Sequence, residues 1–252
     1  MTPKPQANTL DTIYNEDCLE TMKRMPDDSI DLVITSPPYN MRTRIRNGEY
    51  TTREKSEHFS KKYDHFGDDL SIEEYENHHT EVLTELLRVS GLVFWNIQLV
   101  TGSKEAVFKI IGKFATQIRD VIVWDKGHGQ PAMHEGVLNK ATELIIVFEA
   151  DGRKGRTFGK YEFDRGTLQD IWRFGRGGKG QNKGHGAVFP EELVAHILTN
   201  FTKENEVVYD PFMGTGTVAR VCKNLNRSYI GSEISKEYCD IAEERLGQGV
   251  IL

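Results

Sequence analysis

The chain has 252 residues, of which 38% are hydrophobic and 28% are charged, an ordinary composition for a soluble protein with one sizeable core. No apolar run approaches the ~18 residues of a membrane span, and the polar start of the chain has no apolar signal core. Three cysteines without a C-x-x-C pair and eight scattered histidines predict no metal site and fit a reducing compartment. We therefore expect a cytoplasmic protein without a membrane segment.

Positive charge is concentrated in two stretches of a chain whose formal net charge is −6. Met41–Lys62 holds seven Lys/Arg against three Glu, and Asp151–His185 holds nine Lys/Arg against four acids. The remainder of the chain therefore carries a net charge of −15. Such runs are usually solvated surface, but two of them without apolar periodicity favour a surface for a polyanion. We define residues 41–70 and 151–185 as the two basic insertions.

Periodicity and turn residues predict strands that alternate with helices along the chain. Residues 41–70 and 127–140 are predicted to be irregular. The alternation predicts an α/β fold with a doubly wound, mostly parallel sheet, in a single domain over residues 1–252. In chain order we predict strand 10–14, helix 19–25, strand 30–35, helix 71–89, strand 91–97, helix 103–114, strands 118–124, 142–148 and 167–174, helix 190–200, strand 206–210, helix 217–224, strand 228–232 and helix 235–246.

The motif Ser36-Pro37-Pro38-Tyr39 follows a short apolar run, Ile30–Ile34, that is typical of a buried strand. The two prolines end the strand because neither has an N–H group to donate to a neighbouring strand. A hydroxyl, a rigid carbonyl and an aromatic ring are thereby placed at the carboxyl end of a strand. In open α/β sheets that is where ligands bind, although four residues alone are a weak signal.

A second motif, Asp210 to Thr217, reads as a strand end, a glycine turn and the start of a helix. Glycines let the backbone approach a ligand, and the helix N-terminus offers free N–H groups. Glu233, seventeen residues after Gly216, can accept the hydroxyl protons of a ribose. The glycine pattern also fits a dinucleotide, but the carboxylate of Asp210 suits a cationic amine better than a pyrophosphate. S-adenosylmethionine, with its ammonium, sulfonium and ribose, is therefore the favoured cofactor.

The two motifs in this order resemble the DNA amino-methyltransferases of the β-type motif order. In that family [DNS]-P-P-[YF] precedes the cofactor loop F-x-G-x-G, which here is Phe212-Met213-Gly214-Thr215-Gly216. The resemblance covers nearly the whole chain and implies a Rossmann-like methyltransferase fold with permuted motif order, with S-adenosylmethionine as cofactor. Trp124-Asp125-Lys126 and Thr142-Glu143-Leu144-Ile145 are similar to the family's later strands.

The resemblance also implies a set of cofactor-binding residues. Asp17 occupies the position of the family's adenine-contacting acid, with Cys18 beside it. His185 and Pro190 belong to a stretch similar to the last cofactor motif, although Gly186 stands where the family has proline. The implied set is Asp17, Cys18, His185, Pro190, Asp210, Phe212, Gly214, Thr215, Gly216, Thr217 and Glu233.

Chemistry suggests roles for Ser36, Pro37, Pro38 and Tyr39 as the catalytic residues. An exocyclic amine is a poor nucleophile because its lone pair is conjugated into the base. Two acceptors, the Ser36 hydroxyl and the Pro37 carbonyl, can hold the two amino hydrogens and direct the lone pair at the methyl group. Tyr39 can stack on the base, which must leave the duplex to react. No cysteine nucleophile is needed.

The resemblance leaves the target base open. Its Ser-Pro-Pro-Tyr form is found mostly with cytosine N4 and its Asp form mostly with adenine N6, so we favour cytosine. The alternative is adenine, since adenine enzymes with Ser occur and Asn40 is common among them.

DNA is the expected partner, and the basic insertions supply candidate contacts with its phosphates and guanines. A homodimer and a restriction endonuclease partner are further expectations. Three other functions were weighed: methylation of RNA or of a protein amide, DNA binding without activity, and a nicotinamide oxidoreductase. The candidate DNA contacts are Arg42, Arg44, Arg46, Arg153, Lys154, Arg156, Lys160, Arg173, Arg176, Lys179 and Lys183.

Overall fold

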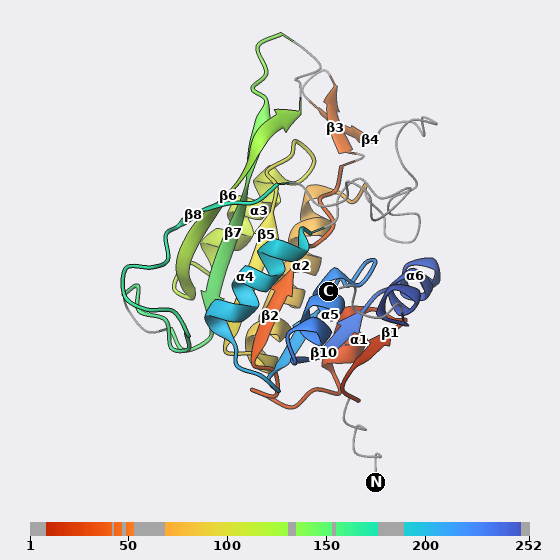
Figure 1. Cartoon of the computed structure of the whole chain (residues 1–252). Coiled ribbons are helices and arrows are strands. Elements are labelled where there is room, and N and C mark those ends of the chain that lie inside the picture. Colours follow the sequence, from red (N-terminus) through yellow and green to blue (C-terminus); the bar gives the residue numbers. More distant parts are fainter. Residues whose placement is uncertain are drawn as a thin grey trace.

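The structure is a computed structural model that describes residues 9–41, 43–46, 49–52, 69–130, 135–152, 155–175 and 189–247, with only the backbone at 43–46, 49–52 and Gln130. Figure 1 shows its elements, which are β1 Thr12–Tyr14, α1 Cys18–Met22, β2 Leu32–Thr35, β3 Thr43–Arg46, β4 Glu49–Thr52, α2 Ile72–Val89, β5 Leu92–Ile97, α3 Lys104–Lys113, β6 Ile118–Gln130, β7 Lys140–Glu149, β8 Ile171–Arg173, α4 Glu191–Phe201, β9 Val207–Asp210, α5 Thr217–Asn224, β10 Ser228–Ser232 and α6 Lys236–Gly247.

Eight strands form one sheet in the order β1-β10-β9-β2-β5-β7-β6-β8. Every neighbouring pair is parallel except the two pairs made by β7, which runs antiparallel to β5 and to β6. The predicted α/β class with a mostly parallel sheet is therefore confirmed. We call the side of the sheet at which β2, β5, β6 and β9 end the carboxyl edge, and the opposite side the amino edge.

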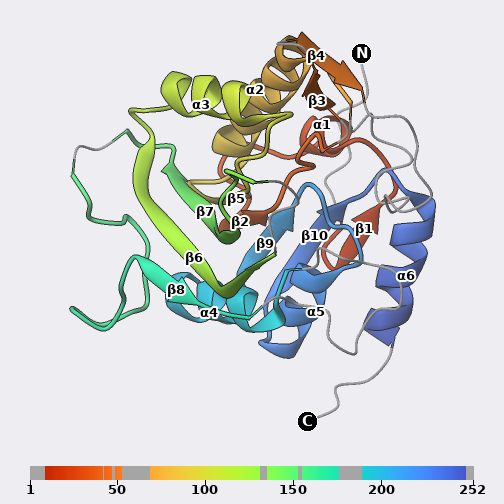
Figure 2. The same cartoon turned by 90° about the horizontal axis from the view of Figure 1, so that it is seen from above.

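Helices cover both faces of the sheet (Figure 2). α1, α2 and α3 pack on one face, where Met22, Tyr75 and Val107 meet Val33 and other inward-facing strand residues. α4 and α5 pack on the opposite face, against the alternate residues of the same strands, such as Ile34 of β2. Two-sided burial explains why the central strands read as continuous apolar runs. Among the helices that the structure describes, none is both long and apolar enough to cross a membrane.

Most predicted elements are confirmed within a few residues. The capping box that predicted the start of α2 is present, because the Ser71 hydroxyl accepts from Glu74 N and the Glu74 carboxylate accepts from Ser71 N. Pro190 was predicted to be the first helical residue of α4, but it is the N-cap, and the helix begins at Glu191.

Two predictions of irregular chain were wrong. Residues 43–46 and 49–52 form the antiparallel pair β3–β4, and β6 continues to Gln130. β6 can pass Gly127, whose φ is 76°, because its register with β7 shifts between Asp125 and Gln130.

Candidate active site

Strand pairing brings the two sequence motifs together at the carboxyl edge. β2 lies directly beside β9, with Val33 opposite Tyr209. The last residue of β2, Thr35, donates its hydroxyl hydrogen to Asp210 Oδ1 at 3.0 Å in a buried contact. The Ser36-Pro37-Pro38-Tyr39 loop and the glycine loop after Asp210 are therefore joined by a hydrogen bond between residues 175 positions apart.

The loop after β2 is held on several sides. Tyr75 of α2 donates its hydroxyl hydrogen to the carbonyl of Pro38 at 2.8 Å. Asn40 has a φ of 55°, a left-handed conformation that asparagine tolerates. Its side-chain amide donates to the carbonyls of Leu70 and Gly102 at 2.8 and 2.9 Å. The Asn40 side chain therefore braces the loop from inside the protein.

The side chains of Ser36 and Tyr39 face each other, with 2.8 Å between Ser36 Oγ and the Tyr39 hydroxyl. Ser36 is half-buried, whereas Tyr39 is only 7% exposed. The Tyr39 hydroxyl donates to Glu143 Oε2 at 3.0 Å, so this end of the ring is directed into the protein. Stacking on a base, as predicted from the sequence, would have to use the small remaining exposed part of the ring.

Sequence reasoning missed three polar residues behind this loop: Asn96 of β5, Lys126 of β6 and Glu143 of β7. Asn96 Nδ2 lies 2.8 Å from the Tyr39 hydroxyl, 2.7 Å from Glu143 Oε2 and 3.3 Å from Ser36 Oγ. Lys126 Nζ donates to Glu143 Oε1 at 2.9 Å. The available signal was a polar residue near the end of an otherwise buried strand, as in Leu92–Ile97, at the edge that holds Ser36.

Asp210 is a buried carboxylate, 3% exposed, and it pairs with no Lys or Arg among the described residues. Burial raises its pKa to about 7, with a smaller contribution from the nearby charge of Glu233. Phe212 N and Thr35 both donate to Oδ1. A carboxylate in this position gains most from a cationic ligand, as the amino group of S-adenosylmethionine would provide.

Glu233 lies at the end of β10 and faces the glycine loop. Its Oε2 accepts from Gly214 N at 2.8 Å and its Oε1 accepts from Ser235 N at 2.8 Å, so the carboxylate has a fixed orientation. Gly216 has a φ of 79°, and a Cβ on it would lie 2.7 Å from Ala242 Cβ. A glycine is therefore required there by both conformation and space.

Several other predicted cofactor-binding residues contact neighbouring parts of the protein. Asp17 caps α1 by accepting from Leu19 N at 2.8 Å, and the adjoining Cys18 is buried, which raises the pKa of its thiol. The Thr215 hydroxyl accepts from Arg245 of α6 at 3.1 Å, so this side chain supports the loop. The Phe212 ring stacks on His79 of α2, with 6.1 Å between ring centroids.

These residues fit S-adenosylmethionine, which carries an ammonium, a ribose and an adenine. Asp210 would hold the ammonium, Glu233 the ribose hydroxyls and Asp17 the adenine, with the Phe212 backbone and glycine loop close to the ligand. Within the described residues no group of three His, Cys, Asp or Glu is arranged to hold a metal ion. Thr217 is the first residue of α5, and Pro190 is the N-cap of α4 on the same face of the sheet.

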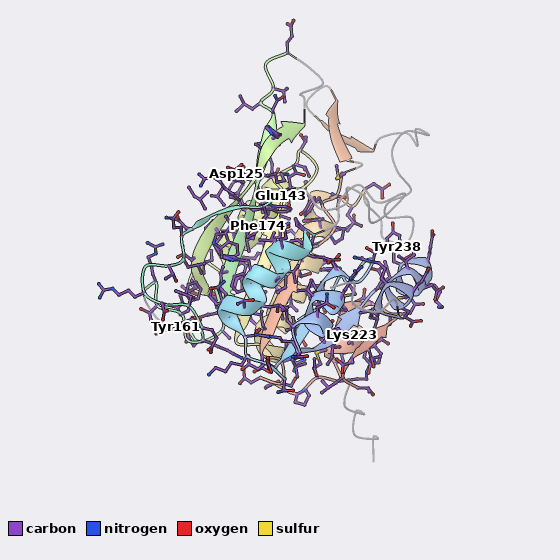
Figure 3. All side chains as sticks on the ribbon, in the orientation of Figure 1. Asp125, Glu143, Tyr161, Phe174, Lys223 and Tyr238 are labelled. Carbon is purple, nitrogen blue, oxygen red and sulfur yellow. The ribbon has the colours of Figure 1, made fainter. Side chains whose placement is uncertain are left out.

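The candidate DNA contacts lie at opposite edges of the sheet. Arg173 ends β8 beside Asp125, with 3.4 Å between Nε and Oδ2, and its side chain is 72% exposed at the carboxyl edge. Arg156 pairs with Asp120 near the start of β6, and Lys160 pairs with Asp31 and Glu206 before β2 and β9. Figure 3 shows the same division: Asp125, Glu143 and Phe174 lie toward one end of the sheet and Tyr161 toward the other.

Arg156 and Lys160 are therefore separated from the Ser36 loop by the length of the sheet, and this position removes them from our set of DNA contacts. The backbones of Arg44 and Arg46 lie in β3. The remaining predicted residues lie outside the described part of the chain: Arg42, Arg153, Lys154, Arg176, Lys179, Lys183 and His185.

Comparisons with known proteins agree with this arrangement. A family model described as DNA methylase, of the N6/N4 type, matches residues 30–244. Type II methyltransferase M.BglII of Bacillus subtilis is 31% identical over 94% of this chain and 69% of its own length. The solved PvuII DNA methyltransferase (cytosine-N4-specific) has a TM-score of 0.72 at 17% identity, over 98% of this chain and 89% of that one. The complex of M1.HpyAVI with SAM has a TM-score of 0.63 at 21% identity, over 93% and 98%.

The chain belongs to the N6/N4 DNA methylase family. It is an S-adenosylmethionine-dependent DNA methyltransferase, which confirms the predicted enzyme class and cofactor. At identities below 25%, the two solved structures support the fold alone.

Proposed function

We propose that the protein methylates the exocyclic N4 amine of cytosine within a specific DNA sequence, on a base rotated out of the duplex. The observation that carries this proposal is the contact between Thr35 and Asp210, which joins the Ser36 loop to the glycine loop. Substrate amine and methyl donor would then meet between two loops that the sheet holds side by side. No covalent enzyme intermediate is needed.

The roles of the residues follow from their positions. Ser36 Oγ and the Pro37 carbonyl would accept the two amino hydrogens, and Asp210 and Glu233 would anchor the cofactor. When bound, S-adenosylmethionine supplies a methyl group on a positively charged sulfur. The protein's contribution is to hold the amine in line with that methyl group and to exclude water, which are effects of orientation and electrostatics.

Cytosine is favoured over adenine because the Ser-Pro-Pro-Tyr form of the motif is found mostly with cytosine N4 and the Asp form mostly with adenine N6. Adenine N6 is the second candidate. Both amines would occupy the same position against Ser36 and Pro37, so the difference must come from contacts with the rest of the base.

Arg173 is the described residue that best fits a DNA contact, because it is exposed at the carboxyl edge. Arg42, Arg44, Arg46, Arg153, Lys154, Arg176, Lys179 and Lys183 remain candidates from the sequence. Two further proposals are a homodimer, which would lengthen the recognised site, and a restriction endonuclease with the same recognition sequence. A cytoplasmic location remains our expectation.

The test is methylation of plasmid DNA with tritiated S-adenosylmethionine, followed by digestion to nucleosides. We expect the label in N4-methylcytosine. Label in N6-methyladenine would replace cytosine with adenine, and label in RNA or protein but not in DNA would overturn the proposal.

The substitution Ser36→Ala tests whether the Ser36 hydroxyl accepts a hydrogen bond from the target amine. We expect its single-turnover rate to fall about a hundredfold, with unchanged binding of S-adenosylhomocysteine, since orientation is lost and the cofactor residues are intact. Ser29→Ala is the matched control, because Ser29 is exposed in a turn before β2 at the amino edge. Full activity of Ser36→Ala would show that this hydroxyl does not hold the amine.

A further inference from the structure

The hydroxyls of Ser36 and Tyr39 and the carboxylate of Glu143 form a continuous line of hydrogen bonds. Ser36 Oγ lies 2.8 Å from the Tyr39 hydroxyl, which lies 3.0 Å from Glu143 Oε2. The line begins on the half-buried Ser36 and ends on a Glu143 side chain that is 11% exposed. It therefore connects the proposed position of the amine with a buried group that can take up a proton.

The reaction produces one excess proton. When the amine nitrogen forms a bond to the methyl carbon, the bond between that carbon and sulfur breaks, and the positive charge moves to the nitrogen. The methylated amine must then lose one hydrogen as a proton to become the neutral product. A group close to the amine has to accept it, and the hydroxyl of Ser36 cannot keep it because a protonated hydroxyl is a strong acid.

We propose that Glu143 receives this proton through Ser36 and Tyr39. The amine passes its proton to Ser36 Oγ, Ser36 passes its hydroxyl proton to the oxygen of Tyr39, and Tyr39 passes its own to Glu143 Oε2. The result is a neutral methylated amine, two unchanged hydroxyls and a protonated carboxyl group. This relay rests on the proposed function, in which Ser36 holds the amine.

Asn96 sets the direction of the relay. Its Nδ2 has two hydrogens and donates at 2.8 Å to the Tyr39 oxygen and at 2.7 Å to Glu143 Oε2. A donor on the Tyr39 oxygen leaves the hydrogen of that hydroxyl to point at the carboxylate, which in its ionised form only accepts. The second lone pair of the Tyr39 oxygen then faces Ser36, so each hydroxyl donates toward Glu143. Asn96 is thus a positioning residue.

Lys126 completes the surroundings of Glu143. The titratable groups that the structure shows in contact with this carboxylate are Lys126 from β6, at 2.9 Å from Oε1, and Tyr39 from the loop after β2. The third partner, Asn96 from β5, does not titrate. Lys126 occupies the oxygen that faces away from Tyr39, which leaves Oε2 as the end of the relay.

The orphaned acceptor of Asn96 is a second, independent observation. Asn96 is 2% exposed, and its Oδ1 is buried without a hydrogen-bond partner among the described residues. Most buried side-chain polar atoms have a hydrogen-bond partner, so an exception calls for an explanation. The contacts of the Asn96 amide nitrogen with Ser36, Tyr39 and Glu143 supply one, because they fix the orientation of the side chain.

The experiment measures single-turnover methylation of DNA as a function of pH for Glu143→Gln, Tyr39→Phe and the double variant. We expect each single variant to be slower by on the order of a hundredfold, the usual contribution of proton transfer by a positioned group. The pH dependence of the rate should differ between the wild type and Glu143→Gln, because only the wild type has a carboxylate at the end of the relay. Glu143→Asp should restore part of the rate.

The double variant separates a relay from two unrelated contacts. Because both residues act in one chain, we expect it to be no slower than the slower single variant. Losses that multiply would overturn the relay, as would a Glu143→Gln rate equal to that of the wild type. The matched controls are Glu149→Gln, the buried carboxylate at the other end of β7, and Tyr161→Phe, an exposed tyrosine at the amino edge.

Two binding measurements keep the outcomes distinct. Affinities for S-adenosylhomocysteine and for DNA should be unchanged in Glu143→Gln, since neither ligand is held by this carboxylate. If Ser36→Ala also keeps full activity, the proposed grip on the amine fails and the relay with it. If Ser36→Ala is slow while Glu143→Gln is not, the relay alone is wrong.

Discussion

Strands β6 and β7 carry a buried ion pair at each end, and the two pairs have different neighbours. Lys126 and Glu143 pair at the carboxyl edge, with side chains 5% and 11% exposed. Arg119 and Glu149 pair at the amino edge, with side chains 3% and 4% exposed. Each pair joins a basic residue of β6 to a glutamate of β7, so by residue type and burial the two are nearly equivalent.

The two ion pairs differ in the further groups that their charged side chains contact. Glu149 also accepts from Gly159 N, and Arg119 also donates to the Gly155 carbonyl and to Asp151. These contacts fasten the start of the second basic insertion to the sheet. At the other end, Glu143 contacts Tyr39, which touches Ser36. A buried ion pair is thus weak evidence of function until its further partners are known.

The largest effect on stability is expected from a substitution that breaks the ion pair between Arg119 and Glu149 at the amino edge. Arg119→Met should lower the free energy of unfolding by about 3–5 kcal/mol, because it leaves the Glu149 carboxylate buried without its cation. The rate of methylation per folded molecule should stay unchanged. Urea denaturation measures the first quantity, and single-turnover methylation well below the unfolding midpoint measures the second.

Lys126→Met is the matched variant at the carboxyl edge. We expect both its free energy of unfolding and its rate of methylation to fall, since the substitution leaves Glu143, the end of the relay, without its cationic partner. A normal rate of methylation in Lys126→Met, or a slow one in Arg119→Met, would contradict the view that only the ion pair at the carboxyl edge takes part in the reaction.

Asp210, a buried carboxylate that pairs with no Lys or Arg among the described residues, should give an effect of intermediate size that depends on pH. Its pKa is about 7 in the folded protein, against an ordinary value of 3.8 for an aspartate, so between these pH values the folded state binds one more proton than the unfolded state. Its contribution to the free energy of unfolding should therefore fall as pH rises from about 4 to about 7 and change little above. We expect ligand-free Asp210→Asn to be more stable than the wild type at pH 8, by on the order of 2–4 kcal/mol, and equal to it near pH 3.

The same substitution should weaken the cofactor's binding about tenfold or more at pH 8, because the ammonium loses its charged partner. Calorimetric titration with S-adenosylmethionine checks this, and thermal denaturation from pH 4 to pH 8 checks the stability. Equal stability of both proteins at pH 8 would contradict a pKa of about 7 for Asp210, and unaltered affinity would contradict its contact with the ammonium.

The smallest effects compare single exposed arginines at the two edges. Arg173→Ala should weaken DNA binding a fewfold and make the salt dependence shallower, because one phosphate contact is lost. Arg156→Ala should leave DNA binding unchanged and alter the free energy of unfolding by less than about 0.5 kcal/mol, since the Arg156 side chain is 76% exposed. Fluorescence anisotropy with labelled duplex DNA at several salt concentrations measures both. Equal losses would show that both edges face DNA.

Local patterns predicted most of the elements because their causes lie within a few residues. The Ser71–Glu74 capping box, the two prolines after Thr35 and the glycine loop after Asp210 each act on adjacent backbone. The β3–β4 pair was missed because one polar four-residue strand has little periodicity until its partner is known. The extension of β6 was missed because Gly127 and Gly129 read as a loop, whereas pairing with β7 carries the strand past them.

The sequence by itself determined the class of enzyme, its cofactor and the two loops that carry Ser36 and Asp210, since these depend on motifs whose order and spacing are visible in one dimension. Only the tertiary structure decided that Asn96, Lys126 and Glu143 stand behind Ser36 and Tyr39, and that Arg156 stands far from them. The physical reason is strand order: β7 runs antiparallel between β5 and β6, so Glu143 near its start reaches the edge at which β5 and β6 end. Its contact with Tyr39 spans 104 residues, a distance over which no local periodicity carries information.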